Sequence, residues 1–201
     1  MQKKLAFDIG CNVGNYTNKL LEKGWNVIAV DPNLFLFNNP PAGVTRVVSA
    51  CSDSSGIIPF YFSNADTIST AAIEWVKDSR FTDKYSWQEY KVNSTTIDLL
   101  VEQYGCPGHI KIDVEGYELI TLRGMTKKYS GEICFEWAEE QGDSAVECVR
   151  YLESLGYSRF GYIFGDDYLR EPEKYIPIDE FLSEFKYDKD RKELWGMIWA
   201  K

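Results

Sequence analysis

A glycine-bearing turn after a short apolar run, near the beginning of the sequence, most constrains the fold of this chain. Leu5–Ile9 predicts a buried strand, and Gly10 and Gly14 give the backbone freedom for a tight turn into an amphipathic segment. This strand–turn–helix order is typical of nucleotide-binding α/β domains, in which N–H groups of the helix's first turn face the ligand. The unit predicts a ligand lying against the main chain at this turn.

Two acidic residues indicate which kind of ligand this is. The spacing Gly-x-x-x-Gly differs from a dinucleotide fingerprint, and Asp8 places a carboxylate at the end of the strand. A carboxylate would repel a pyrophosphate but suits a sulfonium or an amino-acid ammonium. Asp31 ends the next apolar run, about 20 residues on, where an acid accepts hydrogen bonds from ribose hydroxyls. We therefore expect a cationic, adenosine-containing cofactor, and a nicotinamide oxidoreductase is disfavoured.

The rest of the chain alternates between strand and helix patterns. The alternation predicts a doubly wound, mostly parallel α/β sheet with helices on both faces. Expected strands cover residues 27–30, 44–50, 57–62, 87–92, 109–113, 132–136, 157–164 and 193–200, and expected helices follow the first turn as far as Gly24 and cover 34–37 (weakly), 94–104, 116–122, 144–155 and 177–185. The strands over 57–62 and 87–92 are expected to pair as an antiparallel excursion.

Two stretches are expected to border the ligands. Residues 63–86 have poor periodicity, and we interpret them as a flap that binds the acceptor through Trp75, Phe81 and Tyr85. A partly disordered surface excursion is the alternative. Ala50 ends the third expected strand and Cys51, Ser52 and Asp53 follow it, and these four residues are expected near the adenine; a solvated turn explains them equally well.

Acidic residues end four of the expected parallel strands. Because ligands of open α/β sheets bind beyond the carboxyl ends of the strands, Asp8, Asp31, Asp113 and Glu136 are expected to surround one crevice. His109 begins its strand, so we expect it at the opposite end of the sheet in a structural role. Lys111 lies within an apolar strand, and the sequence leaves open whether it faces the crevice or an edge.

Composition limits the partners and the compartment. The formal charge is −9, which disfavours nucleic acid and anionic membrane surfaces. No apolar run approaches the ~18 residues of a membrane span. Five cysteines without Cys-x-x-Cys pairs and a single histidine favour reduced thiols in the cytoplasm and disfavour zinc. A length of 201 residues suits one domain.

Several motifs together resemble the FkbM-type methyltransferases. They are residues 8–14 (DIGCNVG), 30–32 (VDP), 96–98 (TID) and above all 111–118 (KIDVEGYE). The resemblance extends from about Leu5 to Trp137, and the last motif is the most specific. It implies a class I methyltransferase with a seven-stranded sheet that uses S-adenosylmethionine to methylate a hydroxyl of a sugar, a deoxysugar in a glycan or a polyketide ring. Such folds usually carry helices before the first strand, but only four residues precede Leu5, which suggests an open acceptor site, a partner domain or second copy, or a domain cut from a longer polypeptide.

The resemblance and the residues together suggest roles. Cofactor contacts are assigned to Asp8, Gly10, Asn12, Gly14, Asn15, Tyr16, Asp31, Ser52 and Asp53; Asn15 and Tyr16 could instead cap and pack. Asp113, Glu115 and Glu136 are assigned to the acceptor and its activation. Asp113 and Glu136 could hold Mg²⁺ or Mn²⁺, whereas metal-free base catalysis by one of the three is the rival.

Three further alternatives stay open. Glu115 could instead stabilise the N-terminus of the next helix. Trp137 is interpreted as a stacking wall for a sugar ring, or equally as a core residue. A non-catalytic scaffold that binds the cofactor is the alternative to an enzyme.

Overall fold

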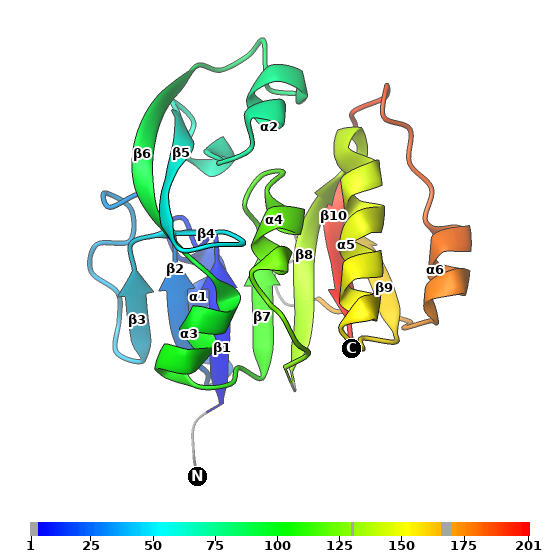
Figure 1. The fold of residues 1–201 in the computed structure, drawn as a ribbon, viewed down its shortest axis with the longest axis horizontal. Coiled ribbons are helices and arrows are strands. Elements are labelled where there is room, and N and C mark those ends of the chain that lie inside the picture. Colours follow the sequence, from blue (N-terminus) through cyan, green and yellow to red (C-terminus); the bar gives the residue numbers. More distant parts are fainter. Residues whose placement is uncertain (1–3, 130, 166–169) are drawn as a thin grey trace.

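The computed structural model describes residues 4–129, 131–165 and 170–201. Its centre is a seven-stranded sheet with strand order β3-β2-β1-β7-β8-β10-β9 (Figure 1). The strands are β1 Leu5–Ile9, β2 Asn26–Val30, β3 Val44–Val47, β7 His109–Ile112, β8 Glu132–Ala138, β9 Phe160–Phe164 and β10 Trp195–Ala200. Only β10 runs antiparallel to its neighbours, β8 and β9. The predicted mostly parallel sheet is confirmed.

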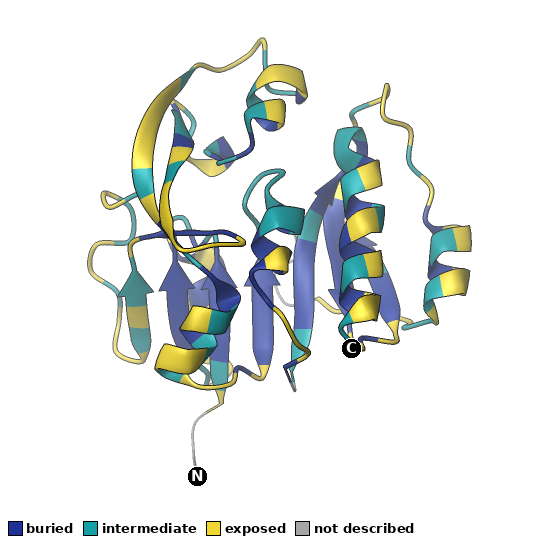
Figure 2. Ribbon diagram, viewed as in Figure 1, coloured by how far each residue is buried: buried dark blue, intermediate teal, exposed yellow. Residues whose placement is uncertain are grey.

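Helices cover both faces of this sheet. They are α1 Asn15–Glu22, α3 Ile97–Tyr104, α4 Glu118–Arg123, α5 Gly142–Ser154 and α6 Ile178–Glu184. The larger core packs α3 to α6 against one face, through side chains such as Leu100, Leu122 and Val149. Tyr16 and Leu20 of α1 pack on the other face. The inner strands β1, β2 and β7 are almost wholly buried, whereas the edge strand β3 is partly exposed (Figure 2).

Local sequence signals account for where these helices begin and end. Gly14 precedes α1 with a φ of +85°, and a Cβ there would meet the Phe37 ring at 2.5 Å, so only glycine fits. Helix α3 begins after Thr96, whose hydroxyl oxygen accepts a hydrogen bond from the backbone N–H of Leu99 at 3.1 Å. It ends at Gly105, with a φ of +97°.

A second layer of structure stands over the carboxyl ends of the central strands (Figure 1). It contains β4 Ala50–Cys51, β5 Gly56–Ser63, the short 3₁₀ helix η1 Asp66–Ile68, α2 Ile73–Asp78 and β6 Trp87–Thr95, with the three strands in the order β4-β6-β5. We call residues 56–95 the excursion. Its strands β5 and β6 pair antiparallel, as predicted.

Three predictions about local structure are wrong. The strand expected over 44–50 is split, because the chain leaves the main sheet after Val47 and joins the small sheet at Ala50. Residues 34–37 form turns and bends instead, and Phe37 adopts a φ of +52°, which lies outside the right-handed helical region. Residues 63–86 are not irregular throughout, because they include η1 and α2. Among the helices of the described residues, none combines the length and apolarity required to cross a membrane.

Candidate active site

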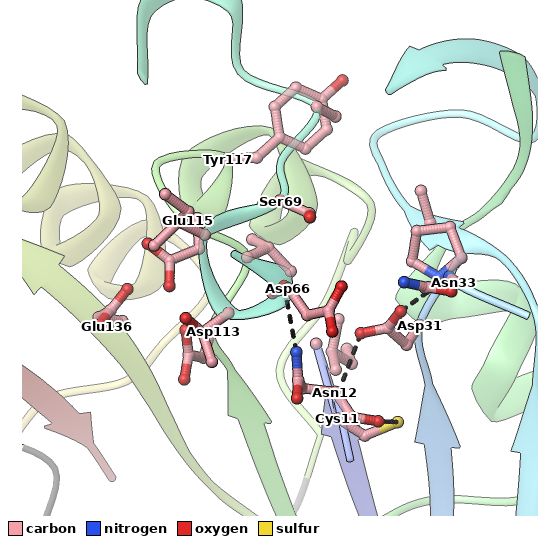
Figure 3. Close-up of a pocket in the computed structure, with 18 of the residues that line it drawn as sticks. Cys11, Asn12, Asp31, Asn33, Asp66, Ser69, Asp113, Glu115, Tyr117 and Glu136 are labelled. Carbon is pink, nitrogen blue, oxygen red and sulfur yellow. Dashed lines mark hydrogen bonds between the residues drawn. The ribbon is translucent and has the colours of Figure 1, made fainter. Parts of the chain in front are cut away.

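A cavity of about 500 Å³ lies between the carboxyl ends of β1, β2, β7 and β8 and the excursion. Strand order reverses between β1 and β7, and open α/β sheets bind ligands at such a switch point. Figure 3 shows the carboxylates of Asp113, Glu115 and Glu136 at one end of this cavity and those of Asp31 and Asp66 at the other. The cavity therefore has two regions of different chemistry.

The glycine turn forms the floor between the two regions. Gly10 has a φ of +78°, and a Cβ there would lie 1.7 Å from the Asp113 carbonyl oxygen. The N–H groups of Gly10 and Cys11 both donate to the carbonyl of Val30, at 2.8 and 3.1 Å. The turn is thus held against β2 and against the end of β7, and no larger residue than glycine fits at position 10.

Asp31 presents a pre-oriented carboxylate at the end of β2. One oxygen accepts from the N–H of Asn12 at 3.0 Å and the other from the N–H of Asn33 at 2.8 Å. The Arg46 guanidinium lies 4.0 Å from the Asp31 carboxylate and also donates to the Asp31 backbone carbonyl. Burial raises the pKa of Asp31 despite these contacts. Each carboxylate oxygen can accept a further hydrogen bond, so the group can receive a vicinal diol.

A buried ion network lies beneath the floor. The Lys111 ammonium is 3.5 Å from an Asp8 oxygen and 3.1 Å from an Asp113 oxygen, and it donates to the Gly10 carbonyl at 3.2 Å. The Thr17 hydroxyl donates to Asp8 at 2.5 Å. Burial alone would lower the pKa of Lys111, but Asp113 and Asp8 outweigh it and raise the pKa. The network fixes the glycine turn and one acid of the site to each other.

This network corrects the prediction for Asp8. Its side chain is fully buried and does not line the cavity, because Lys111 and Thr17 occupy its oxygens. Asp8 is therefore not placed to contact a cofactor directly, and only Asp31, Asp113 and Glu136 of the four predicted carboxylates border the crevice. Lys111 itself borders the cavity, which settles the question that the sequence left open.

Three carboxylates gather at the other end of the cavity. Asp113 and Glu115 follow β7, Glu136 comes from β8, and one oxygen from each lies within 4.8 Å of the others. Burial first, and the charge of Asp113 second, raise the pKa values of Glu115 and Glu136 well above the ordinary range. Such a group of hard oxygen donors can share a proton or surround a divalent cation.

The loop that carries Glu115 is held in an uncommon conformation. Glu115 has a φ of +54°, which few residues other than glycine adopt. One oxygen of Glu118 accepts from the N–H groups of Val114 and Gly116, at 3.0 and 3.3 Å. Burial raises the pKa of Glu118 to about 7. Strained backbone of this kind persists only where the surroundings enforce it, and it concentrates at functional sites.

The excursion and the C-terminal strands complete the wall beside the acids. Trp75, Arg80 and Phe81 line it from the excursion, Tyr117 from the Glu115 loop, and Trp195 from β10. The sequence pointed to Trp75 and Phe81, whereas Tyr85 does not line the cavity. Trp195 was missed. Because β10 is antiparallel to β8, its first residue, Trp195, pairs with Ala138 at the carboxyl end of β8 and so reaches the cavity. Predicting that the last strand is antiparallel would have identified Trp195.

Ionic contacts tie the excursion to this wall. The Arg80 guanidinium donates to both oxygens of Glu140, at 2.9 and 2.5 Å, and to the carbonyl of Leu194 at 2.8 Å. The neighbouring Glu139 lies in the 3₁₀ helix η2 Glu139–Gln141 and accepts from three backbone N–H groups of residues 188–194. Arg80 was not identified from the sequence, because its partners lie 60 or more residues away.

Most other predicted site residues also border the cavity. Those that do are Gly10, Asn12, Asn15, Tyr16, Asp31, Ala50, Cys51, Asp113, Glu115 and Glu136. The Tyr16 hydroxyl nevertheless points to the His109 ring at 2.6 Å. As predicted, His109 begins β7 and is buried away from the cavity.

Besides Asp8 and Tyr85, four predicted positions lie elsewhere. Gly14 contacts Phe37 and does not line the cavity. Ser52 is turned toward the Tyr117 hydroxyl at 3.2 Å, and Asp53 is exposed, because β4 ends at Cys51 and the chain then leaves the crevice. Trp137 faces the core and meets the Phe185 ring at 4.7 Å, since its neighbour Glu136 occupies the crevice side of β8. The stacking-wall interpretation of Trp137 is therefore wrong.

Comparison with known families identifies the chain. A family model described as the methyltransferase FkbM domain matches residues 8–159, which include the glycine turn, the excursion and all three acids of the cluster. The chain belongs to the FkbM methyltransferase family. S-adenosylmethionine is the cofactor expected for this family, and the resemblance inferred from the motifs is confirmed.

One solved structure supports the fold of this FkbM-family protein, and two others are reported beside it. An FkbM methyltransferase from Methylobacillus flagellatus superposes with a TM-score of 0.57 at 14% identity, covering 99% of this chain and 43% of that one. Precorrin-6y C5,15-methyltransferase from Geobacter metallireducens has a TM-score of 0.46 at 13% identity, covering 99% of this chain and 79% of that one. An S-adenosylmethionine-dependent O-methyltransferase from Thermotoga maritima has a TM-score of 0.43 at 10% identity, covering 99% of this chain and 59% of that one. A search of curated proteins found no significant match. The predicted class I methyltransferase fold is confirmed, and the chain spans less than half the length of the Methylobacillus protein.

Proposed function

We propose that this protein methylates a sugar hydroxyl, of a deoxysugar within a glycan, with S-adenosylmethionine as the methyl donor. The observation that carries the proposal is the cluster of Asp113, Glu115 and Glu136 in the same cavity as the glycine turn and Asp31. A hydroxyl acceptor needs help to lose its proton, and acids beside the donor site can give it. An acceptor that is already nucleophilic would not need them.

The cofactor end of the cavity fits an adenosine and an amino acid. The Asp31 carboxylate keeps hydrogen-bonding capacity for the ribose hydroxyls, and Ala50 and Cys51 offer apolar surface to the adenine. The glycine turn and Asn12 would hold the methionine part. Bound S-adenosylmethionine supplies a methyl group activated by a sulfonium, so the chain must only place the acceptor oxygen in line with it.

The acids activate the acceptor in one of two ways. Their oxygen donors suit Mg²⁺ or Mn²⁺, and Asp113, Glu115 and Glu136 would hold the ion, which would lower the pKa of the acceptor hydroxyl. Without a metal, the raised pKa values of Glu115 and Glu136 suit either residue to take the hydroxyl proton. In both cases the Lys111 contact fixes the position of the Asp113 carboxylate.

Charge and ring chemistry favour a neutral sugar acceptor. Arg80 and Lys111 are the basic side chains among the described cavity-lining residues, and both are already engaged by protein carboxylates and carbonyls. An acceptor with a phosphate or carboxylate would therefore meet acids without a free cation. The rings of Phe81, Tyr117 and Trp195 offer apolar faces against which a sugar ring can pack.

Binding and transfer assays test the proposal. We expect calorimetry to detect S-adenosylhomocysteine binding, and labelled methyl to pass from S-adenosylmethionine to at least one member of a panel of deoxysugar glycosides. Glu136→Gln should abolish transfer yet keep cofactor binding, whereas Glu147→Gln, an exposed change on α5, should keep both. Absence of cofactor binding by folded protein would overturn the proposal.

Two further outcomes decide between alternatives. Binding without transfer to any member of the panel would favour the non-catalytic scaffold. For the choice of mechanism, transfer that is lost in EDTA and restored by Mn²⁺ supports the metal. Equal transfer with and without EDTA supports a carboxylate base.

A further inference from the structure

Thr70, in the excursion, lies against the loop that carries Glu115. Its hydroxyl oxygen is 2.8 Å from the Glu115 carbonyl oxygen and 3.2 Å from the Val114 carbonyl oxygen. Thr70 is fully buried, although it belongs to a segment that stands over the sheet rather than within it. Burying a hydroxyl costs free energy unless the hydroxyl forms hydrogen bonds, and here the bonds join two segments that are distant in the sequence.

The two carbonyls share the single hydroxyl proton of Thr70, and this shared hydrogen bond holds the backbone of Glu115. The Val114 carbonyl belongs to the peptide plane before Glu115, and the Glu115 carbonyl belongs to the plane after it. Holding both planes sets φ and ψ of the residue between them. The second plane is also held from its other side, since the Gly116 N–H donates to Glu118. Glu115 thereby stays at a φ of +54°, in a conformation unfavourable for a residue with a side chain.

The excursion in turn fixes Thr70. Its backbone pairs with Tyr61 of β5 through two hydrogen bonds, at 2.7 and 3.1 Å. The Ala72 N–H donates to the Thr70 hydroxyl oxygen at 2.9 Å, which directs the hydroxyl proton toward the Glu115 loop. The direction of the Thr70 hydroxyl thus depends on the position of the excursion over the cavity.

We infer that Thr70 is a positioning residue for the methyl-transfer reaction. It holds Glu115 in the left-handed conformation that brings its carboxylate beside Asp113 and Glu136. The acid cluster is therefore complete only when the excursion packs over the cavity as described. The segment that lines the acceptor region thus also positions one of the acids that activate the acceptor. The inference rests on the proposed function, because it assigns the Glu115 carboxylate a part in catalysis.

A set of matched variants tests this role. Thr70→Val removes the hydroxyl with little change in volume, and Thr70→Ser keeps it. Thr121→Val is the control, because Thr121 is also fully buried and donates to one backbone carbonyl, that of Cys51, at 2.9 Å. Each variant is compared by kcat, by calorimetric S-adenosylhomocysteine affinity, and by hydrogen exchange of the 113–119 peptide.

For Thr70→Val we expect kcat to fall roughly 10- to 100-fold, because misplacing a reacting group by about 1 Å costs this much. S-adenosylhomocysteine affinity should stay within about twofold, and amides of residues 114–118 should exchange faster. Thr70→Ser should restore kcat and protection, and Thr121→Val should leave both near the wild-type values. A Thr70→Val enzyme with wild-type kcat, or a loss that Thr121→Val equals, would overturn the inference.

Failure of the proposed function gives a different result. If the wild-type protein transfers no methyl to any acceptor, the kinetic comparison is void and exchange decides alone. Faster exchange of 114–118 in Thr70→Val but not in Thr121→Val would then still support the positioning contact. Unchanged exchange in both variants would refute it.

Discussion

Replacing Lys111 with methionine removes a buried cation that joins the glycine turn to the acid cluster. Methionine has a similar length and packs in buried sites, so the change mainly removes charge. The variant loses the contacts to Asp8 at 3.5 Å, to Asp113 at 3.1 Å and to the Gly10 carbonyl at 3.2 Å. Removing one partner of a buried ion pair costs about 3–5 kcal/mol, because the other charge stays buried and unpaired.

Urea unfolding at neutral pH, followed by tryptophan fluorescence, measures this loss. For a chain of this length the loss corresponds to a fall in Tm of about 6–20 °C. Lys91→Met is the control, since Lys91 is exposed on β6 and its loss should change stability by less than about 0.5 kcal/mol. Adding Asp8→Asn to Lys111→Met should recover part of the loss, because it removes the carboxylate left without its cation. A loss below about 1 kcal/mol, or a double variant less stable than Lys111→Met, would refute the reasoning.

Three other predictions concern charge, cofactor and packing. Burial and like charge raise the folded-state pKa values of Glu115 and Glu136, so their stabilising contribution is present below the ordinary carboxyl pKa and is lost as the pH rises through the raised values. The Tm of metal-free protein should therefore fall as the pH rises above the ordinary glutamate pKa of about 4.3, and fall less in Glu136→Gln; a Tm that rises instead contradicts it. Asp31→Asn should weaken S-adenosylhomocysteine binding roughly 10- to 100-fold by calorimetry, and unchanged affinity would remove Asp31 from the ribose site. Trp137→Ala should cost about 3–5 kcal/mol of unfolding free energy, whereas Trp195→Ala should cost less than about 1 kcal/mol and raise the acceptor KM; the reverse pattern would contradict their placement.

The parallel core of the fold was predictable because its signals are local. Short apolar runs that end in acids, a glycine turn, and helices that stop at Gly24, Gly105 and Gly156 each depend on a few neighbouring residues. The same locality explains the wrong strand over 44–50. Both parts of that stretch are extended and suited to a sheet, and the change from one sheet to another after Val47 depends on pairing with β6, more than 40 residues away.

Asp113 and Glu136 of the acid cluster were predictable from strand ends, whereas Glu115 was assigned with the family resemblance, and the contacts around the cluster needed the pairing of strands. Asp8 and Lys111 stand opposite each other in the parallel register of β1 and β7, so aligning the two predicted strands would have paired them. Strand alternation likewise separates Glu136 from Trp137, and it would have placed one in the crevice and the other in the core.

The excursion's contribution could not be read from local pattern. Thr70 and Arg80 act through partners more than 40 residues distant, and several of these partners are backbone carbonyls, which carry no sequence signature. The poor periodicity of residues 63–86 indicated a functional segment without indicating which side chains matter. Long-range contacts to main chain are the part of this site that only the folded structure supplies.

The missing side chain of Gly10 has a consequence for redesign of this enzyme family. The loop after β1 lies against the loop after β7 there, with room only for a hydrogen between them. A chimaera that imports the KIDVEG segment from a homologue must therefore keep glycine at position 10, because any Cβ there would lie 1.7 Å from the carbonyl oxygen of Asp113. The first turn of the chain and a motif a hundred residues later thus constrain each other at one atom.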